Sequence, residues 1–314
     1  MYQNILLLLV GLFILILGGD FLVKGASSFA LRFNISPMVV GLTIVAFGTS
    51  APELLISISA ALSGSPDMTM GNIVGSNICN LGLVLGVTAL ISPIYVGKTS
   101  LKLDWPMTMG SSLALFFIAQ SGSINYVFGI SFVLVLVTYV VYLIVKSKSQ
   151  TEFVVAIDDD IPSAPSSSQL KDVTFMAVGC AGLYFGADWF VGGAQHLAAL
   201  LGVSERIIGI TVLALGTSLP ELTTAVIASI KKETDLALGN LLGSNIFNVL
   251  SILGITSIIK EIQVNPLIVR LDMPWMLGIT FIILPFMFTG KHIERWEGII
   301  LLLVYGIYTY SVIV

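Results

Sequence analysis

GLTIVAFGTSAPEL at residues 41–54 returns as GITVLALGTSLPEL at residues 209–222, with 9 of 14 positions identical. A second peptide, GNIVGSNICN at residues 71–80, returns as GNLLGSNIFN at residues 239–248, with 7 of 10 positions identical. Both copies lie 168 residues apart, and the first peptide sets a glutamate, Glu53 or Glu221, inside an apolar segment. A carboxylate duplicated in this way indicates one cation site shared by two halves of the chain.

The composition is typical of a membrane protein, with 56% hydrophobic and only 10% charged residues in a chain of 314. Apolar runs of about 18 or more residues recur, and each can cross the hydrocarbon core of a bilayer as a helix. The net charge of −4 points to no nucleic-acid partner, and two isolated cysteines suggest neither a disulfide framework nor a zinc site. We expect an all-α polytopic membrane protein with ten transmembrane helices, near residues 4–23, 37–62, 68–92, 103–120, 124–145, 172–191, 205–230, 236–259, 271–289 and 296–313.

The basic residues predict how these spans are oriented. Eleven fall on one side of the predicted membrane and three on the other. Because cytoplasmic loops carry the Lys/Arg excess, both termini should be extracellular. Five spans precede the linker and five follow it, so the second copy should enter the membrane from the opposite face, as an inverted repeat. This predicts a first five-helix repeat at residues 1–145, a cytoplasmic linker at 146–171, and a second, inverted five-helix repeat at 172–314.

The first peptide predicts an interrupted helix beside the glutamate. Pro52 has no N–H for the carbonyl of Gly48, so we expect the backbone from Ala46 to Thr49 to unwind and expose carbonyl oxygens. Thr49 and Ser50 lie four and three residues before Glu53, on its side of a helix. The second copy repeats the arrangement with Thr217, Ser218, Pro220 and Glu221.

The second peptide predicts the facing wall of the site. Its polar residues are spaced by four, which places them in one stripe on each helix. Among them we interpret Ser76, Asn80, Ser244 and Asn248 as ligands, and Asn72, Asn240, Asn77 and Asn245 mainly as interhelical hydrogen-bond formers.

The candidate ligands are all oxygen atoms of carboxylates, amides, hydroxyls or carbonyls. This set suits hard cations such as Ca²⁺ and Na⁺ rather than zinc or copper. Two carboxylates about 5 Å apart repel each other by roughly 3 kcal/mol at an effective dielectric of 20, so a divalent ion would neutralise the pair.

GTSAPE with GSNICN, and GTSLPE with GSNIFN, resemble the paired α-repeats of the sodium/calcium exchanger family, within the cation/calcium antiporter superfamily. The resemblance covers essentially the whole chain, and it implies Na⁺-driven Ca²⁺ countertransport without a cofactor, by a minimal prokaryotic exchanger. It also implies that Glu53 and Glu221 hold Ca²⁺ and share the Na⁺ ions. The other implied ligands are the hydroxyl or carbonyl oxygens of Thr49, Ser50, Thr217, Ser218, Ser76 and Ser244, the carbonyls of Ala46 and Ala214, and Asn80 and Asn248 at the middle.

Several alternatives stay open. Potassium-dependent relatives typically carry aspartate where both copies here have asparagine, which disfavours K⁺ dependence without excluding it, and Ca²⁺/H⁺ exchange also fits two buried carboxylates. A cation channel would use a symmetric ring of carboxylates. An intramembrane aspartyl protease would need a catalytic pair such as Asp20 and Asp188, which lie near span ends, so we expect no enzyme. Both halves of the site are in one chain, so a monomer suffices. Asp104 and Asp272 are predicted to cap the helices that follow them.

Overall fold

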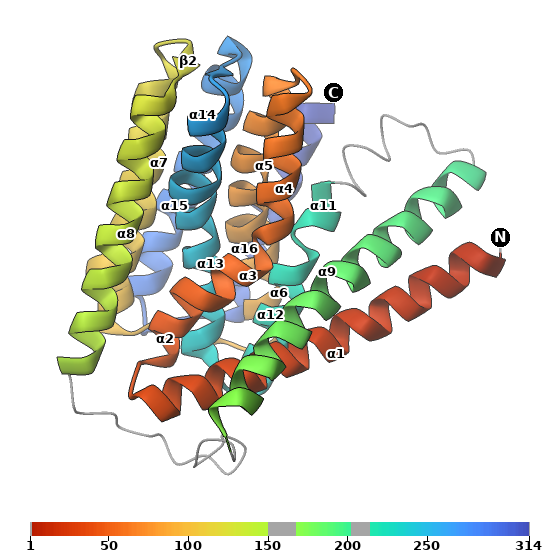
Figure 1. The fold of residues 1–314 in the computed structure, drawn as a ribbon, viewed down its shortest axis with the longest axis vertical. Coiled ribbons are helices and arrows are strands. Elements are labelled where there is room, and N and C mark those ends of the chain that lie inside the picture. Colours follow the sequence, from red (N-terminus) through yellow and green to blue (C-terminus); the bar gives the residue numbers. More distant parts are fainter. Residues whose placement is uncertain (1, 150–167, 202–213, 314) are drawn as a thin grey trace.

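The computed structural model describes residues 2–149, 168–201 and 214–313, and it is predominantly helical (Figure 1). The first half contains α1 (Tyr2–Phe33), α2 (Pro37–Val40), α3 (Ala46–Thr49), α4 (Ala51–Leu62), α5 (Pro66–Cys79), α6 (Leu85–Ile91), α7 (Trp105–Ala119) and α8 (Tyr126–Ser149). The second half contains α9 (Gln169–Leu200), α11 (Ala214–Thr217), α12 (Leu219–Ile230), α13 (Thr234–Phe247), α14 (Gly254–Ile259), α15 (Met273–Phe288) and α16 (Arg295–Ile313). Residues 150–167 and 202–213 are not described, so most of the predicted linker and the start of the predicted span at 205–230 lie outside the described residues.

Wider π-helical turns interrupt several of these helices. They lie at η1 (Gly41–Val45), η2 (Asn80–Val84), η3 (Ser100–Asp104), η5 (Asn248–Leu253) and η6 (Ile268–Asp272). The turns η2 and η5 begin at Asn80 and Asn248, which occupy the same position in the two copies of the second peptide. Single π-turns inside α-helices are frequent at functional sites. Here they mark both predicted asparagine ligands.

The helices are long and apolar enough for an integral membrane protein. Six helical segments of the described part can each cross a bilayer, or seven if the bent pair Pro37–Thr49 and Ala51–Leu62 is one span. The helix Leu219–Ile230 is apolar but shorter. The predicted helical membrane class is therefore confirmed, whereas the count of ten spans stays a prediction.

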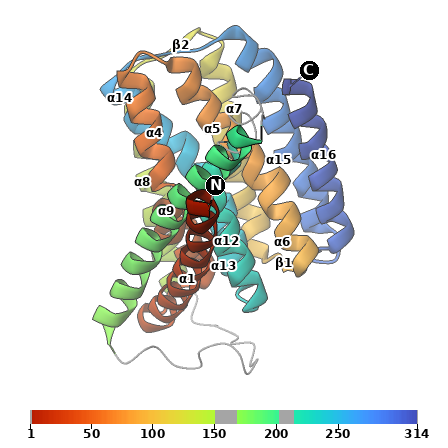
Figure 2. The ribbon, with the colours of Figure 1, turned by 90° about the vertical axis from the view of Figure 1, so that its right-hand side faces the viewer.

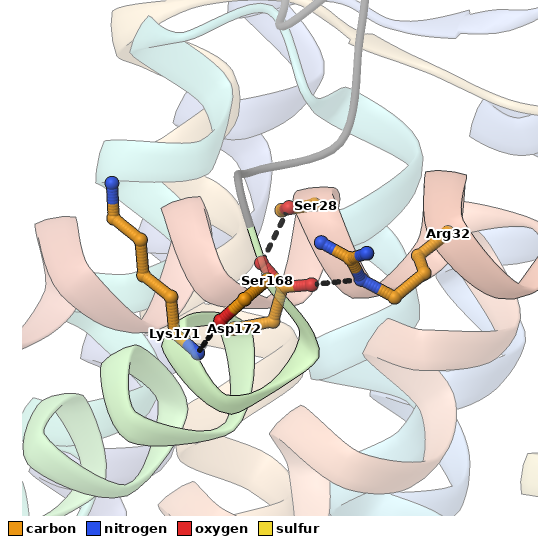
Figure 3. A network of polar contacts seen from close by, with 5 residues as sticks. All are labelled: Ser28, Arg32, Ser168, Lys171 and Asp172. Carbon is orange, nitrogen blue, oxygen red and sulfur yellow. Dashed lines mark hydrogen bonds and ion pairs between the residues drawn. The ribbon is translucent and has the colours of Figure 1, made fainter.

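Helices α1 and α9 pack along each other as a pair that extends away from the rest of the bundle (Figures 1 and 2). Glycines let their backbones touch: a Cβ atom on Gly11 would lie 2.5 Å from the backbone nitrogen of Phe190, and one on Gly18 2.7 Å from that of Leu183. At one end of the pair, buried Asp172 accepts hydrogen bonds from Ser28 Oγ at 2.6 Å and from Arg32 Nε at 2.6 Å (Figure 3). The ion pair and the glycine contacts make the two helices one packed unit.

Contacts in the two halves correspond under the 168-residue offset. A Cβ atom on Gly11 would lie 2.9 Å from the carbonyl oxygen of Gly186. At the corresponding positions, a Cβ atom on Gly179 would lie 2.8 Å from the carbonyl oxygen of Gly18. Two-residue strands follow the same rule: β1 (Ile94–Tyr95) pairs with β4 (His292–Ile293), and β2 (Ser123–Ile124) pairs with β3 (Ile262–Gln263). Each strand therefore pairs with the opposite half, and β1 and β2 lie at opposite ends of the bundle (Figure 2).

The predicted helix caps at Asp104 and Asp272 are wrong. The π-helical turns η3 and η6 run directly into α7 and α15, and neither aspartate makes a capping hydrogen bond. A helix that continues through the aspartate leaves no free N–H groups to cap. Instead, Asp104 accepts a hydrogen bond from Tyr139 at 2.9 Å and Asp272 one from Tyr308 at 3.1 Å.

Candidate ion-binding site

The two repeated glutamates each stand in the first turn of a helix that follows a break. Glu53 lies in α4 and Glu221 in α12, with side chains buried to 1% and 0% exposure. The break is the same in both copies: Ser50 has φ −88° and ψ 8°, and Ser218 has φ −90° and ψ 5°. In the first copy the helix axis bends by 46° at this point.

The break lies later in the chain than the sequence predicts. Residues Ala46–Thr49 form the helical turn α3, so the predicted unwinding there is wrong. The missing N–H of Pro52 weakens the turn just before the proline, and the helix yields at Ser50. The carbonyl oxygen of Ala46 accepts hydrogen bonds from the backbone N–H of Ser50 at 3.0 Å and from Thr49 Oγ1 at 3.3 Å. This predicted ligand is therefore engaged within its own helix.

Residues from both halves of the chain meet at Glu221. Ser50 Oγ donates a hydrogen bond to Glu221 Oε1 at 2.9 Å, and Ser244 Oγ donates one to the same oxygen at 3.4 Å. Thr49 Oγ1 lies 3.1 Å from Asn240 Oδ1 and 3.5 Å from Ser244 Oγ, and its single proton is shared between Asn240 Oδ1 and the carbonyl oxygen of Ala46. The hydroxyls of the first break thus reach the carboxylate of the second half.

Several buried oxygen atoms around the two glutamates have no hydrogen-bond partner in the described part of the chain. Unpaired buried acceptors of this kind are costly, and in a native protein an ordered water or a bound ion satisfies them. They are Glu53 Oε1 and Oε2, Glu221 Oε2, Asn80 Oδ1, Asn248 Oδ1 and Ser218 Oγ. These atoms come from both copies of both peptides, and such oxygen atoms suit a hard cation. The unpaired buried atoms also include one nitrogen of the second peptide, Asn240 Nδ2, which cannot bind a cation.

The remaining predicted ligands are close to this set in the fold. Ser76 is buried in α5 one turn before Asn80. Thr217 ends the short helix α11 beside the second break. Ala214 begins α11 directly after the undescribed residues 202–213, so the structure does not test its carbonyl. Among the described residues, no group of three or more His, Cys, Asp or Glu side chains could hold a metal.

Three asparagines, interpreted from the sequence mainly as interhelical hydrogen-bond formers, contact the predicted ligands. Asn240 Oδ1 lies 3.1 Å from Thr49 Oγ1, and this contact between α13 and α3 is an interhelical hydrogen bond of the predicted kind. Asn77 and Asn245 contact the predicted ligands directly: Asn80 Nδ2 donates to Asn245 Oδ1 at 3.2 Å, and Asn248 Nδ2 donates to Asn77 Oδ1 at 3.0 Å. Their position three residues before each ligand was a visible signal, because residues three apart share a helix face.

Comparisons with known proteins show which family the chain belongs to. The profile of the family described as "Sodium/calcium exchanger protein" matches residues 3–145 and 171–314. The chain belongs to this family. CaxA of Alkalimonas amylolytica is 38% identical over 308 residues, with 96% of each chain covered. The sodium/calcium exchanger MaX1 of Methanosarcina acetivorans is 34% identical over 337 residues, again with 96% of each chain covered. A solved structure of the sodium-calcium exchanger NCX_Mj superposes with a TM-score of 0.85 at 29% identity, covering 98% of both chains.

Proposed function

We propose that this protein is a secondary antiporter that exchanges Na⁺ for Ca²⁺ across the cell membrane by alternating access. The observation that carries the proposal is the convergence of unpaired oxygen atoms from both repeats on the buried Glu53 and Glu221. Two carboxylates balance the charge of one Ca²⁺, and Na⁺ ions compete for the same oxygens. Family membership and the relatives named as sodium/calcium exchangers support this choice of ions.

We further propose that the chain is an inverted repeat of two five-helix units with both termini outside. The crossed strand pairs and the matched glycine contacts support a two-fold relation between the halves. The same relation gives a site whose two walls exchange roles when the protein opens to the other side. The proposed ligands are the set predicted from the sequence, with Asn80, Asn248, Glu53 and Glu221 at the centre.

The family stoichiometry of three Na⁺ per Ca²⁺ would move one net charge per cycle. In Na⁺-loaded vesicles, Ca²⁺ uptake would then export one positive charge. An inside-positive potential should therefore make Ca²⁺ uptake more favourable by about 2.3 kcal/mol per 100 mV. Uptake that ignores the potential would mean electroneutral exchange.

The test is uptake of radioactive Ca²⁺ by the purified protein in vesicles loaded with Na⁺, with Na⁺, K⁺ and H⁺ gradients varied one at a time. We expect uptake that requires internal Na⁺ and needs no K⁺. Uptake that ignores Na⁺ and follows a pH gradient would establish Ca²⁺/H⁺ exchange instead. A requirement for K⁺ on the Ca²⁺ side would establish a potassium-dependent exchanger. Unitary currents in a bilayer recording would reveal a channel.

Glu53→Gln and Glu221→Gln should each abolish Ca²⁺ transport, because each removes half of the charge that balances the ion. Glu297→Gln is the matched control, since Glu297 is equally buried but accepts hydrogen bonds from Thr289 and the backbone of Glu294 at the start of α16. Normal transport by either site variant would refute a shared carboxylate site.

A further inference from the structure

Four asparagines form a closed hydrogen-bonded set at the contact between α5–η2 and α13–η5. All four are buried to 1% exposure or less: Asn77, Asn80, Asn245 and Asn248. The bonds run between the halves of the chain. Asn80 Nδ2 donates to Asn245 Oδ1 at 3.2 Å, and Asn248 Nδ2 donates to Asn77 Oδ1 at 3.0 Å. Asn77 Nδ2 donates to the backbone carbonyl of Asn245 at 3.4 Å, and Asn245 Nδ2 donates to that of Asn77 at 3.2 Å.

These contacts allow one orientation for each side-chain amide. A backbone carbonyl can accept but not donate, so the atoms of Asn77 and Asn245 that face the opposite backbone must be their NH₂ groups. Their Oδ1 atoms must then face the other way, toward Asn248 and Asn80. Asn248 and Asn80 must therefore donate hydrogen bonds to these oxygens from their own NH₂ groups. Asn80 Oδ1 and Asn248 Oδ1 are consequently left to point elsewhere, and both lack a hydrogen-bond partner among the described residues.

We propose that Asn77 and Asn245 are positioning residues for ion binding: each fixes the amide of a ligand from the other repeat so that only its carbonyl oxygen faces the ion. This inference rests on the proposed function, because it assigns Asn80 and Asn248 their role there. Outer partners that orient ligands commonly matter for metal affinity almost as much as the ligands themselves. The crossing of the bonds also couples the halves, since displacement of α13 moves the partner of Asn80, and displacement of α5 moves that of Asn248.

The set also explains why both middle positions are asparagine in this chain. An ionised aspartate at position 80 or 248 would have no N–H to donate. It would place a carboxylate oxygen against the Oδ1 acceptor of Asn245 or Asn77 in a buried site, at the cost of the hydrogen bond and of added repulsion. The arrangement thus requires a neutral hydrogen-bond donor at both positions, and the two asparagines keep the site at two formal charges.

The hydrogen bonds predict which pairs of asparagine substitutions have non-additive effects, and double-mutant cycles can test this. Truncation of Asn77 to alanine keeps its backbone carbonyl, so the Asn80–Asn245 bond survives, and the converse holds for Asn245. The Asn80→Ala and Asn245→Ala changes should therefore be strongly coupled, as should Asn248→Ala and Asn77→Ala. Asn80→Ala with Asn77→Ala should be close to additive.

The measurement is the half-saturating Ca²⁺ concentration for uptake into Na⁺-loaded vesicles, together with the Ca²⁺-induced rise in Tm of the detergent-purified protein. We expect Asn245→Ala to raise the half-saturating concentration about 3- to 10-fold, the range for one buried hydrogen bond, and at most about 2-fold in an Asn80→Ala background. Thr69→Val is the matched control: Thr69 is buried in α5 and donates to the backbone carbonyl of Ser57. This variant should lose some stability but keep its response to Ca²⁺.

An equal effect of Asn245→Ala with and without Asn80 would overturn the proposal, as would an unchanged Ca²⁺ response in a folded Asn245→Ala protein. If Asn245→Ala does not fold, the cycle on Asn77 and Asn248 decides the same question. The unmodified protein reports separately on the proposed function. Absence of Na⁺-driven uptake there would refute the exchange assignment, while the Tm cycle would still measure the positioning of the amides around bound Ca²⁺.

Discussion

Loss of the Ser50 hydroxyl should weaken Ca²⁺ binding through the opposite repeat. Ser50 Oγ donates to Glu221 Oε1 at 2.9 Å, whereas the other donor to this oxygen, Ser244 Oγ, is at 3.4 Å. A hydrogen bond to a charged group contributes about 1.5–3 kcal/mol, which corresponds to about 10- to 150-fold in affinity. Because Ser244 remains as a donor, we expect Ser50→Ala to fall at the lower limit, with an about tenfold rise in the half-saturating Ca²⁺ concentration.

The assay is Ca²⁺ uptake into Na⁺-loaded vesicles over a range of external Ca²⁺, with the amount of folded protein measured in parallel. Ser112→Ala is the control, because Ser112 is buried to 1% exposure in α7, a helix that carries neither glutamate, and its hydroxyl donates to the Thr108 carbonyl of its own helix at 2.8 Å. Ser218→Ala should also raise the half-saturating Ca²⁺ concentration, because Ser218 Oγ is one of the buried oxygen atoms without a hydrogen-bond partner among the described residues and belongs to the proposed ligand set. A folded Ser50→Ala protein with wild-type Ca²⁺ dependence would refute the role of this hydroxyl.

Two further changes address the pairing of α1 with α9. Gly18→Ala should lower the Tm, because the new Cβ would lie 2.7 Å from the backbone nitrogen of Leu183, and overpacking costs about 1–3 kcal/mol. Gly110→Ala is its control, since no described atom lies within 4 Å of that Cβ, and an unchanged Tm for both would contradict the tight packing. Asp172→Asn should destabilise the protein by about 3 kcal/mol, the low end for a broken buried pair, because Arg32 is 23% exposed. Denaturant unfolding in detergent measures this, and a loss indistinguishable from zero would mean that the pair contributes little.

Much of the site could be predicted because it depends on local rules. Proline has no N–H and therefore interrupts a helix interior, so Pro52 and Pro220 predict a break beside each glutamate. The place of the break was wrong by a few residues, since the helical turn at Ala46–Thr49 is retained by its own hydrogen bonds and the chain yields at Ser50. The residue types alone do not show which turn breaks. In the structure the Thr49 hydroxyl contacts the Ala46 carbonyl and so helps to keep the turn at Ala46–Thr49 helical, a contact that the sequence pattern does not specify.

The doubled peptides by themselves determined the class of site: two carboxylates in apolar segments, oxygen ligands, and two related halves. They determined it because helix breaking, charge and ligand type belong to the residues wherever they lie. The tertiary structure decided which oxygen atoms meet. Only packing of segments some 170 residues apart joins Ser50 to Glu221 and Asn80 to Asn245. Those bonds depend on how the helices approach each other, which no single peptide encodes, and they leave the carbonyl oxygens of Asn80 and Asn248 without a hydrogen-bond partner among the described residues.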